Sequence, residues 1–301
     1  MAYYSGQAAD YNELRSVLIS ACTSHGWTSH ANSIISNDNN FVQLDIVEHN
    51  PQVQLGGGLV LKGGTGLADS TVANPSPVTP RLGNISQDGS GMNLIFPVLY
   101  NIHIFDGEVF LVIKYNVDRF QYIAFGGSEN THYLAATTQR YLPLYGSFFL
   151  TEHGSSSSNW QQAGSAFFYD VDVFSGEFGR NTAYHDGVWS NGGINNQNQV
   201  SAFPYFQGLI DIQPNAWNQE SIFLPFHIFK RMAENKLSII YSVENARFIR
   251  IDNFEPEQII TLGTDRWKVY PFHRKSTASR DGGNGIDHSG TFGWAIKYDG
   301  P

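Results

Sequence analysis

The chain has 301 residues, of which 41% are hydrophobic and only 15% are charged, while aromatic residues reach 14%. Few charges combined with many aromatic residues favour a β-rich protein, and the formal net charge of −9 argues against nucleic acid as a partner. A single cysteine, Cys22, excludes an internal disulfide, and the lack of a run of 18 apolar residues predicts no membrane span.

The first predicted element is an amphipathic helix that begins after Asp10 and ends before Gly26. Asp10 and Glu13 have the spacing of a capping box. The residues after them repeat at helical spacing on one apolar face, namely Leu14, Val17, Leu18, Ala21 and Cys22. Residues 33–49 then read as a β-hairpin that turns at Asn-Asp-Asn-Asn. A helix followed by a small sheet predicts an α+β opening.

Glycine clusters enclose a short predicted strand within residues 56–66, GGGLVLKGGTG. This segment lacks the order of a phosphate-binding loop because Lys62 precedes the glycines, so we interpret them as tight turns or close backbone contacts. Residues 68–93 are rich in Pro, Ser, Asn and Gly and are predicted to be a long loop. We place a domain boundary there, between an N-terminal helix plus small β domain at 1–90 and a β-rich domain at 91–301.

Residues 95–126 give the clearest architecture, a meander of three antiparallel strands. Asp106-Gly107 has the composition of a two-residue hairpin turn, and Asn116–Arg119 is predicted to make the second turn. In the middle strand, Val109, Leu111, Ile113 and Tyr115 lie on one face, and Phe110 and Val112 lie on the other. Apolar residues on both faces predict a central strand that is covered on both sides.

The second half begins with a segment, residues 128–200, that we interpret as a loop-rich insertion with long exposed loops. Strands are predicted at 221–229 and 265–274. Residues 236–252 are predicted to form another hairpin, with its turn at Glu244-Asn245. These elements together predict an α+β fold that is predominantly antiparallel β, with sandwich-like sheets and an N-terminal helix.

The last predicted strand lies within residues 288–300 and carries a large apolar face. That face consists of Phe292, Trp294, Ile296 and Tyr298. Such a strand is held either by pairing within its own sheet or by adding to the edge of a neighbour's sheet.

Three residues near the end of the helix, Cys22, His25 and His30, are of types that bind zinc. Cys22 and His25 share a helix face, but a zinc site needs further ligands and no second pair is evident. Cys22 also fits the apolar stripe. We therefore favour a core-and-cap role for these residues, and we expect neither a metal nor a cofactor.

Two pairs, His288-Ser289 and His185-Asp186, contain the residue types of a catalytic triad. The sequence has no G-x-S-x-G elbow, and both pairs lie in Gly-rich loops where Ser and His are ordinary turn residues. We therefore predict no nucleophilic catalysis at either pair.

Asp170 and Asp172, with Glu177, have the residue types of a glycosidase or of a Ca²⁺ site. Alternate strand positions place both aspartates on one face, which suits a solvated face at least as well. His103 alternates with Asn101 on the more polar face of its strand, and we interpret it as a hydrogen-bonded histidine of the sheet.

Several stretches resemble structural proteins of tailed-bacteriophage virions. The first is YYSGQAADYNELRSVLISACTSHGW, near the start, and the second is the strand pair NVDRFQYIAFG. Residues 246–275 and 288–301 resemble the C-terminal end of the same proteins, and GTDRWKVYPF is the most specific part. The resemblance covers about half of the chain and excludes 128–200. It implies a tail or baseplate component that assembles with other virion proteins, and it brings no catalytic residues.

Low charge, polar loops and the lack of an export signal or catalytic constellation favour the same function. We expect a non-enzymatic structural component of a bacteriophage tail or baseplate, made in the bacterial host cytoplasm and located in the virion. We expect it to be a homo-oligomer that also binds other virion proteins, with part of 128–200 or a sheet edge at an interface. Phe167 and Phe168 are candidate interface contacts.

Two other classes of function stay open. A receptor- or glycan-binding tail-tip module would stack a host-surface sugar on Trp160, Trp189 or Trp217, and it predicts an exposed aromatic shelf. A polysaccharide-degrading enzyme predicts two carboxylates that face each other about 5–9 Å apart. A pure assembly protein predicts large flat contact surfaces and neither of these features.

Overall fold

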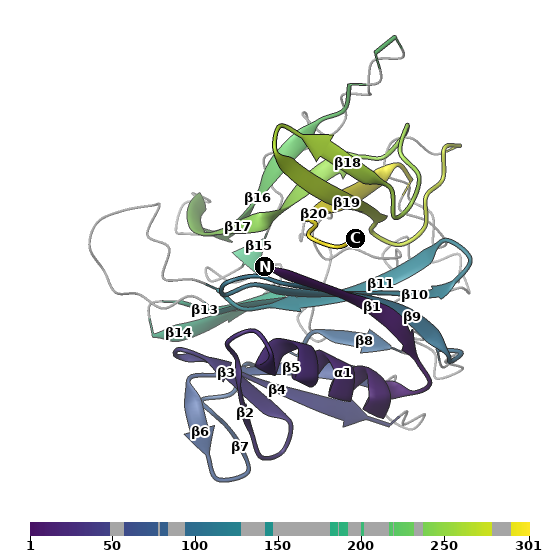
Figure 1. The fold of residues 1–301 in the computed structure, drawn as a ribbon. Coiled ribbons are helices and arrows are strands. Elements are labelled where there is room, and N and C mark those ends of the chain that lie inside the picture. The colour runs from purple at the N-terminus through teal and green to yellow at the C-terminus, as the bar shows by residue number, and fades with distance from the viewer. Residues whose placement is uncertain are drawn as a thin grey trace, which may run out of the picture.

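A computed structural model shows how the predicted elements assemble. It describes residues 1–48, 57–77, 79–83, 94–127, 142–146, 181–185, 187–191, 200–201, 217–218, 220–231, 237–278 and 290–301. Figure 1 shows these residues as three stacked layers, with a sheet in the middle, a second sheet above it, and a third sheet with the helix below it.

The central layer is an antiparallel seven-stranded sheet in the order β1-β9-β10-β11-β12-β13-β14. Its strands are β1 (Ala2–Ala8), β9 (Val98–Ile104), β10 (Val109–Asn116), β11 (Arg119–Phe125), β12 (Leu142–Gly146), β13 (Asn181–His185) and β14 (Val188–Asn191). The predicted meander is confirmed, because β9, β10 and β11 are neighbours and their turns hold Gly107 and Asp118 at positive φ. The segment 128–200 supplies β12, β13 and β14, and most of its other residues lie outside the described part.

The lower layer consists of a five-stranded sheet in the order β2-β3-β4-β5-β8 and the helix α1 (Tyr11–Thr23). The strands are β2 (Thr28–His30), β3 (Ile34–Asn37), β4 (Asn40–Val47), β5 (Gly58–Gly64) and β8 (Arg81–Gly83), with a separate ribbon of β6 (Gly66–Ala68) and β7 (Thr71–Ala73). The predicted cap of the helix is confirmed, since Asp10 accepts a hydrogen bond from the Glu13 backbone N–H at 2.8 Å. The predicted hairpin is confirmed as β3 and β4.

Two glycines of β5 show why that segment is glycine-rich. A Cβ at Gly58 would lie 2.4 Å from the carbonyl oxygen of Leu82, and one at Gly63 would lie 2.6 Å from side-chain atoms of Leu144 and Trp189. These close contacts confirm the interpretation of the glycines as points of close approach. The stretch 68–93, predicted to be a long loop, contains β7 and β8 in its described part.

The upper layer is a six-stranded sheet in the order β15-β16-β17-β20-β19-β18. Its strands are β15 (Val200–Ser201), β16 (Phe223–Arg231), β17 (Leu237–Arg250), β18 (Ile259–Leu262), β19 (Asp265–Pro271) and β20 (Phe292–Lys297). The last strand pairs on both sides, with β17 and with β19. The aromatic strand near the end of the sequence is therefore an interior strand of its own sheet and is not added to a neighbour's edge.

The hairpin predicted for residues 236–252 is wrong, because Leu237–Arg250 form one continuous strand. The register between β16 and β17 shifts within this strand, which is the mark of a bulge. The backbone N–H groups of Glu244 and Asn245 donate to the buried carboxylate of Glu108, at 2.9 and 3.0 Å. The polar pair that was expected to form a turn instead binds the carboxylate of a residue in the turn just before β10.

Each face of the central sheet buries its own hydrophobic core. The lower core contains Val109, Leu111 and Ile113 together with Leu14, Leu18 and Cys22 of the helix. The upper core contains Phe110 and Val112 of the same strand. It also contains Phe248, Tyr270, Phe292, Trp294 and Ile296 of the six-stranded sheet and Phe272, which directly follows β19. Strand β10 is therefore covered on both faces, as predicted.

The predicted fold class is confirmed, since the chain is predominantly antiparallel β with an N-terminal helix. Among the described residues, no helix has both the length and the apolar character needed to cross a bilayer.

Candidate functional site

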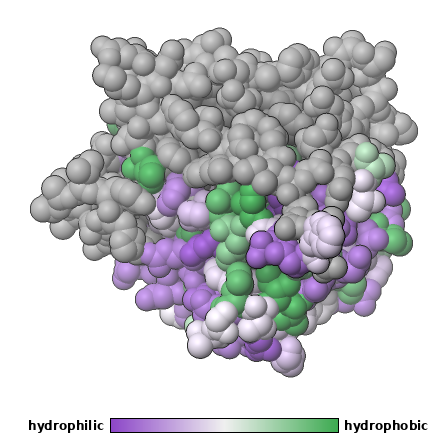
Figure 2. All heavy atoms as spheres, turned by 90° about the horizontal axis from the view of Figure 1, so that it is seen from above, coloured by the Kyte–Doolittle hydropathy of each residue, from purple (hydrophilic) through white to green (hydrophobic). Residues whose placement is uncertain are grey.

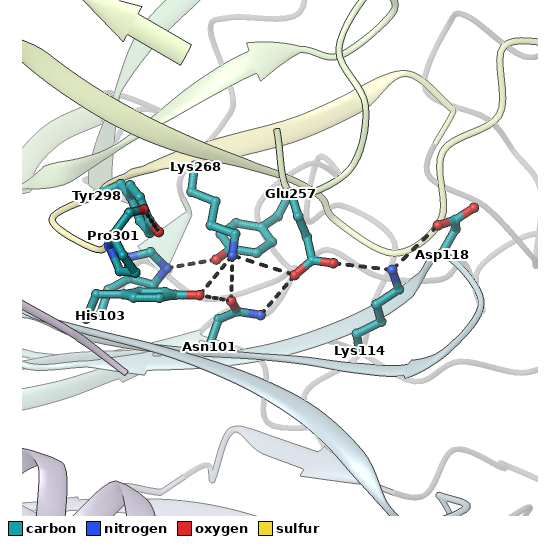
Figure 3. Close-up of polar contacts among 10 residues, drawn as sticks. Asn101, His103, Lys114, Asp118, Glu257, Lys268, Tyr298 and Pro301 are labelled. Atoms are coloured by element: carbon teal, nitrogen blue, oxygen red, sulfur yellow. Dashed lines mark hydrogen bonds and ion pairs between the residues drawn. The ribbon is translucent and has the colours of Figure 1, made fainter. Parts of the chain in front are cut away.

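Polar side chains gather between the central and upper sheets at the side where β1 and β9 face β19. Figure 3 shows them pointing toward one another from both layers. We call this group the Lys268 network, and it consists of Tyr3, Asn101, His103, Lys114, Glu257, Lys268, Tyr270 and Tyr298. It joins ionisable groups of two layers, so its chemistry decides what kind of site it is.

Lys268 is the centre of the network because alternation along β19 points it toward the central sheet. Its Nζ donates to the hydroxyl of Tyr3 at 2.8 Å and to Oδ1 of Asn101 at 2.9 Å. The Tyr3 hydroxyl in turn donates to the same Oδ1. The ammonium also lies 5.0 Å from the ring centroid of Tyr3, 5.9 Å from that of Tyr270 and 5.7 Å from that of Tyr298. An ammonium ion so close to three aromatic rings gains cation–π attraction from each of them.

Glu257 carries the negative charge that balances this lysine. Its Oε1 lies 3.7 Å from Lys268 Nζ and accepts from Asn101 Nδ2 at 3.3 Å. Its Oε2 accepts from Lys114 Nζ at 3.2 Å, and Lys114 also pairs with Asp118 at 3.8 Å. One carboxylate therefore joins a lysine of the central sheet to a lysine of the upper sheet.

His103 ends the network in the interior. Its Nδ1 contacts the carbonyl oxygen of Lys297 at 3.1 Å, and its Nε2 contacts the hydroxyl of Tyr270 at 2.9 Å. Burial lowers the pKa of this imidazole to about 3, and the positive charge of Lys268 acts in the same direction. The ring is neutral at physiological pH, which agrees with its interpretation as a hydrogen-bonded histidine of the sheet.

A second buried carboxylate, Glu108, joins the same two layers just before β10. It accepts four hydrogen bonds, from the Tyr241 hydroxyl at 2.5 Å, the backbone N–H groups of Glu244 and Asn245 at 2.9 and 3.0 Å, and Asn245 Nδ2 at 2.9 Å. Burial raises the pKa of this carboxyl, and the four donors act against that rise. Glu108 and the Lys268 network both bind groups of their own chain, so the chemistry they support is the joining of layers.

The structure pairs a serine with a histidine that the sequence did not single out. His227 and Ser242 lie opposite each other in β16 and β17, and the imidazole Nδ1 is 2.9 Å from the serine hydroxyl. Burial and nearby Arg247 lower the pKa of this histidine. Only the register of the two strands could have revealed the pair, and the hairpin wrongly predicted for 236–252 concealed it. A nucleophile on a flat sheet gains no oxyanion-binding donors from that setting, so we interpret the pair as a cross-strand contact.

The residues considered for zinc are placed in structural roles. Cys22 is buried in the lower core, and burial raises the pKa of its thiol. The ring of His25 contacts the hydroxyl of Tyr4 at 3.3 Å, and that of His30 contacts the hydroxyl of Ser36 at 2.8 Å. Among the described residues, no group of three or more His, Cys, Asp and Glu side chains is arranged to hold a metal ion.

The residues considered for catalysis are described only in part. His185 is fully buried in β13. Asp186, the residue that follows it, lies outside the described residues. The other candidates also lie outside them, namely Asp170, Asp172, Glu177, His288 and Ser289. The carboxylate and triad hypotheses therefore stay predictions.

The structure describes two of the five aromatic candidates, Trp189 and Trp217. Trp189 is partly buried and donates from Nε1 to the carbonyl oxygen of Asn74 at 2.8 Å, while its ring packs against Tyr184 at a centroid distance of 5.2 Å. It therefore links β14 to the lower layer. Trp217 is 96% exposed. The remaining candidates, Trp160, Phe167 and Phe168, lie outside the described residues.

No family model matches the sequence, and no curated protein matches it either.

Proposed function

We propose that this chain is a structural subunit of a bacteriophage tail or baseplate, assembled with copies of itself and with other virion proteins. The observation that carries the proposal is apolar surface that the fold gathers at one end of the central sheet. Leu99 lies opposite Lys114 in the pairing of β9 with β10, and both Ile95 and Val117 lie beyond this pair at the same end. Their exposures are 72% for Ile95, 49% for Leu99 and 78% for Val117.

Exposed aliphatic residues gathered in one place are typical of surfaces that another protein covers. Isolated exposed apolar residues need no such explanation, but Leu99 lies in β9, Ile95 precedes β9 and Val117 follows β10, all at the same end of this strand pair. The low charged fraction of 15% adds little electrostatic protection against association. The buried polar clusters of the described residues bind their own chain, which also suits an assembly subunit.

The resemblance of both terminal regions to virion proteins supports the tail or baseplate as the place of assembly. In this proposal the chain is made in the bacterial host cytoplasm and becomes part of the virion before lysis. It catalyses no reaction there and needs no cofactor.

The proposal is tested by placing an early stop codon in the gene, within the genome that carries it, and examining the particles by electron microscopy. We expect particles with missing or incomplete tails, and restored tails when the intact chain is supplied from a plasmid. Normal, infective particles made without the chain would contradict the proposal.

Trp217 supports receptor or glycan binding as a second candidate function. An exposed indole ring offers a flat apolar face of the kind that stacks against the C–H face of a sugar, and this ring is 96% exposed. A glycan array probed with the wild-type chain and with Trp217→Ala tests this candidate. Binding that is lost in the variant would support it, and the absence of binding by the wild-type chain would argue against it.

A further inference from the structure

Strand β18 forms one edge of the six-stranded sheet. Its sequence is Ile-Ile-Thr-Leu, and it contains none of the charged residues or prolines that proteins commonly place on an edge strand to prevent pairing. Two of its side chains are substantially exposed, Ile259 at 41% and Leu262 at 49%. Two other edge strands carry polar or charged residues, because β1 exposes Ser5 and Gln7 and β8 begins with Arg81.

The register of the hairpin shows which backbone groups β18 leaves outside the sheet. Leu262 pairs with Asp265 across a two-residue turn, and the residues that flank such a turn exchange hydrogen bonds. Hydrogen-bonded and non-hydrogen-bonded pairs alternate along an antiparallel ladder. Ile260 and Leu262 therefore direct their N–H and C=O groups toward β19, whereas Ile259 and Thr261 direct theirs outward.

The outer face of this sheet is apolar beside β18. Alternation places Trp267, Val269 and Ala295 on the face that points away from the central sheet, where they form a third cluster with Ile260 packed against it. These three side chains are buried. Figure 2, which views the molecule from above, shows apolar residues between polar ones on the described surface. Ile260 lies directly opposite Trp267 in the ladder, so the apolar cluster reaches the edge strand.

We propose that β18 pairs antiparallel with β18 of a second copy of this chain. The two-fold axis that relates the copies passes between their Thr261 residues. The strand is complementary to itself in this register, which is what a two-fold interface requires. The outward N–H and C=O groups of each Thr261 meet those of its counterpart. Ile260 of each copy then lies beside Leu262 of the other on the outer face, and the two apolar clusters become one.

The proposed contact is small, because each copy contributes a strand of four residues. Stable complexes usually bury about 1,200–2,000 Å², so we expect a dimer that dissociates on dilution and is reinforced by other contacts within an assembly. The inference rests on the proposed function in that it names one partner of the assembly subunit, a second copy, and the strand that binds it.

The test uses Thr261→Cys and a short bis-maleimide cross-linker. Residues in a hydrogen-bonded antiparallel pair have Cα atoms about 5.5 Å apart, within reach of such a reagent. Cys22 is buried, so the variant presents one accessible thiol. The matched control is Ser29→Cys, at an exposed position of edge strand β2. We expect efficient cross-linked dimer from Thr261→Cys and little from the control. Equal, background yields from both would overturn the proposal.

A second variant, Thr261→Lys, is measured by sedimentation velocity over a range of concentrations. It places two like charges directly opposite each other at the two-fold axis, where they repel, while the exposed position leaves the fold intact. We expect the dimer dissociation constant to rise at least tenfold relative to wild type, with an unchanged circular dichroism spectrum. A variant that dimerises as well as wild type would show that the contact lies elsewhere and would overturn the proposal.

Cross-linking of virions that carry Thr261→Cys separates this inference from the proposed function. A 261–261 dimer of the purified chain, together with the absence of the chain from particles, would retain the inference and overturn the proposed function. Particles that contain the chain but show no such cross-link would retain the proposed function and overturn the inference.

Discussion

Two buried ionisable residues, Glu108 and His103, show how single side chains hold the upper and central layers together. Both lie between the sheets, and both have their polar atoms bound by groups of the opposite layer. Burying such groups is costly unless every polar atom finds a partner. The two layers therefore stack stably only when these contacts form.

Glu108→Ala should lower the free energy of unfolding by about 3 kcal/mol or more, because it leaves the buried Tyr241 hydroxyl and three partly buried donors without their acceptor. Urea denaturation followed by tryptophan fluorescence measures the change. Glu255→Ala is the control, since this side chain is largely exposed, and it should alter stability by no more than about 0.5 kcal/mol. Equal effects from both variants would show that Glu108 does not hold the layers.

His103 predicts a dependence of stability on pH. Its pKa falls from 6.5 to about 3 on folding, so below pH 6.5 the unfolded chain binds a proton that the folded chain does not. Stability from this residue is therefore present above pH 6.5 and is lost as the pH falls toward 3, with a slope that approaches about 1.4 kcal/mol per pH unit.

The measurement compares urea unfolding of wild type and His103→Gln between pH 4 and 7. Glutamine retains hydrogen-bonding groups but does not titrate. Protonation of Glu108 occurs in both proteins, so its effect on stability cancels in the comparison. The difference in stability between them should shrink as the pH falls. Parallel curves over this range would contradict a neutral, buried imidazole.

At the scale of elements, the sequence predicted best where alternation and turn chemistry agreed. The meander of β9, β10 and β11 has an Asp-Gly turn and an apolar middle strand, and the structure confirms both. The helix was predictable from its cap and its apolar stripe. In contrast, Glu244-Asn245 has the composition of a turn but lies within β17, because the partner of its backbone N–H groups is Glu108, more than a hundred residues away.

Ile113→Asp should abolish folding, at a cost of about 4 kcal/mol or more, because it places an unpaired carboxylate in the fully buried lower core. Its control is Val117→Asp, near the exposed end of the same strand, which should change stability by no more than about 0.5 kcal/mol. Far-ultraviolet circular dichroism and expression of soluble protein report the outcome. A folded Ile113→Asp chain would contradict the position of β10 between two cores.

At the scale of the whole molecule, three layers follow from a central sheet that is apolar on both faces. The two-sided pattern of β10 was visible in the sequence, but the order of the layers was not, because it depends on pairings between distant segments. The Lys268 network shows the same limit: Tyr3 and Lys268 meet across 265 positions of sequence, and no local pattern marks either residue.

The proposed function makes one claim about the molecule as a whole, that copies of it are built into a particle. Purified virions from the genome that carries this gene, analysed by quantitative mass spectrometry against a known coat protein, test this claim most directly. We expect the chain to be present in a fixed, multiple copy number per particle and to stay bound after washing at high salt. Particles of full infectivity that lack the chain, or contain it only in trace and variable amounts, would contradict it.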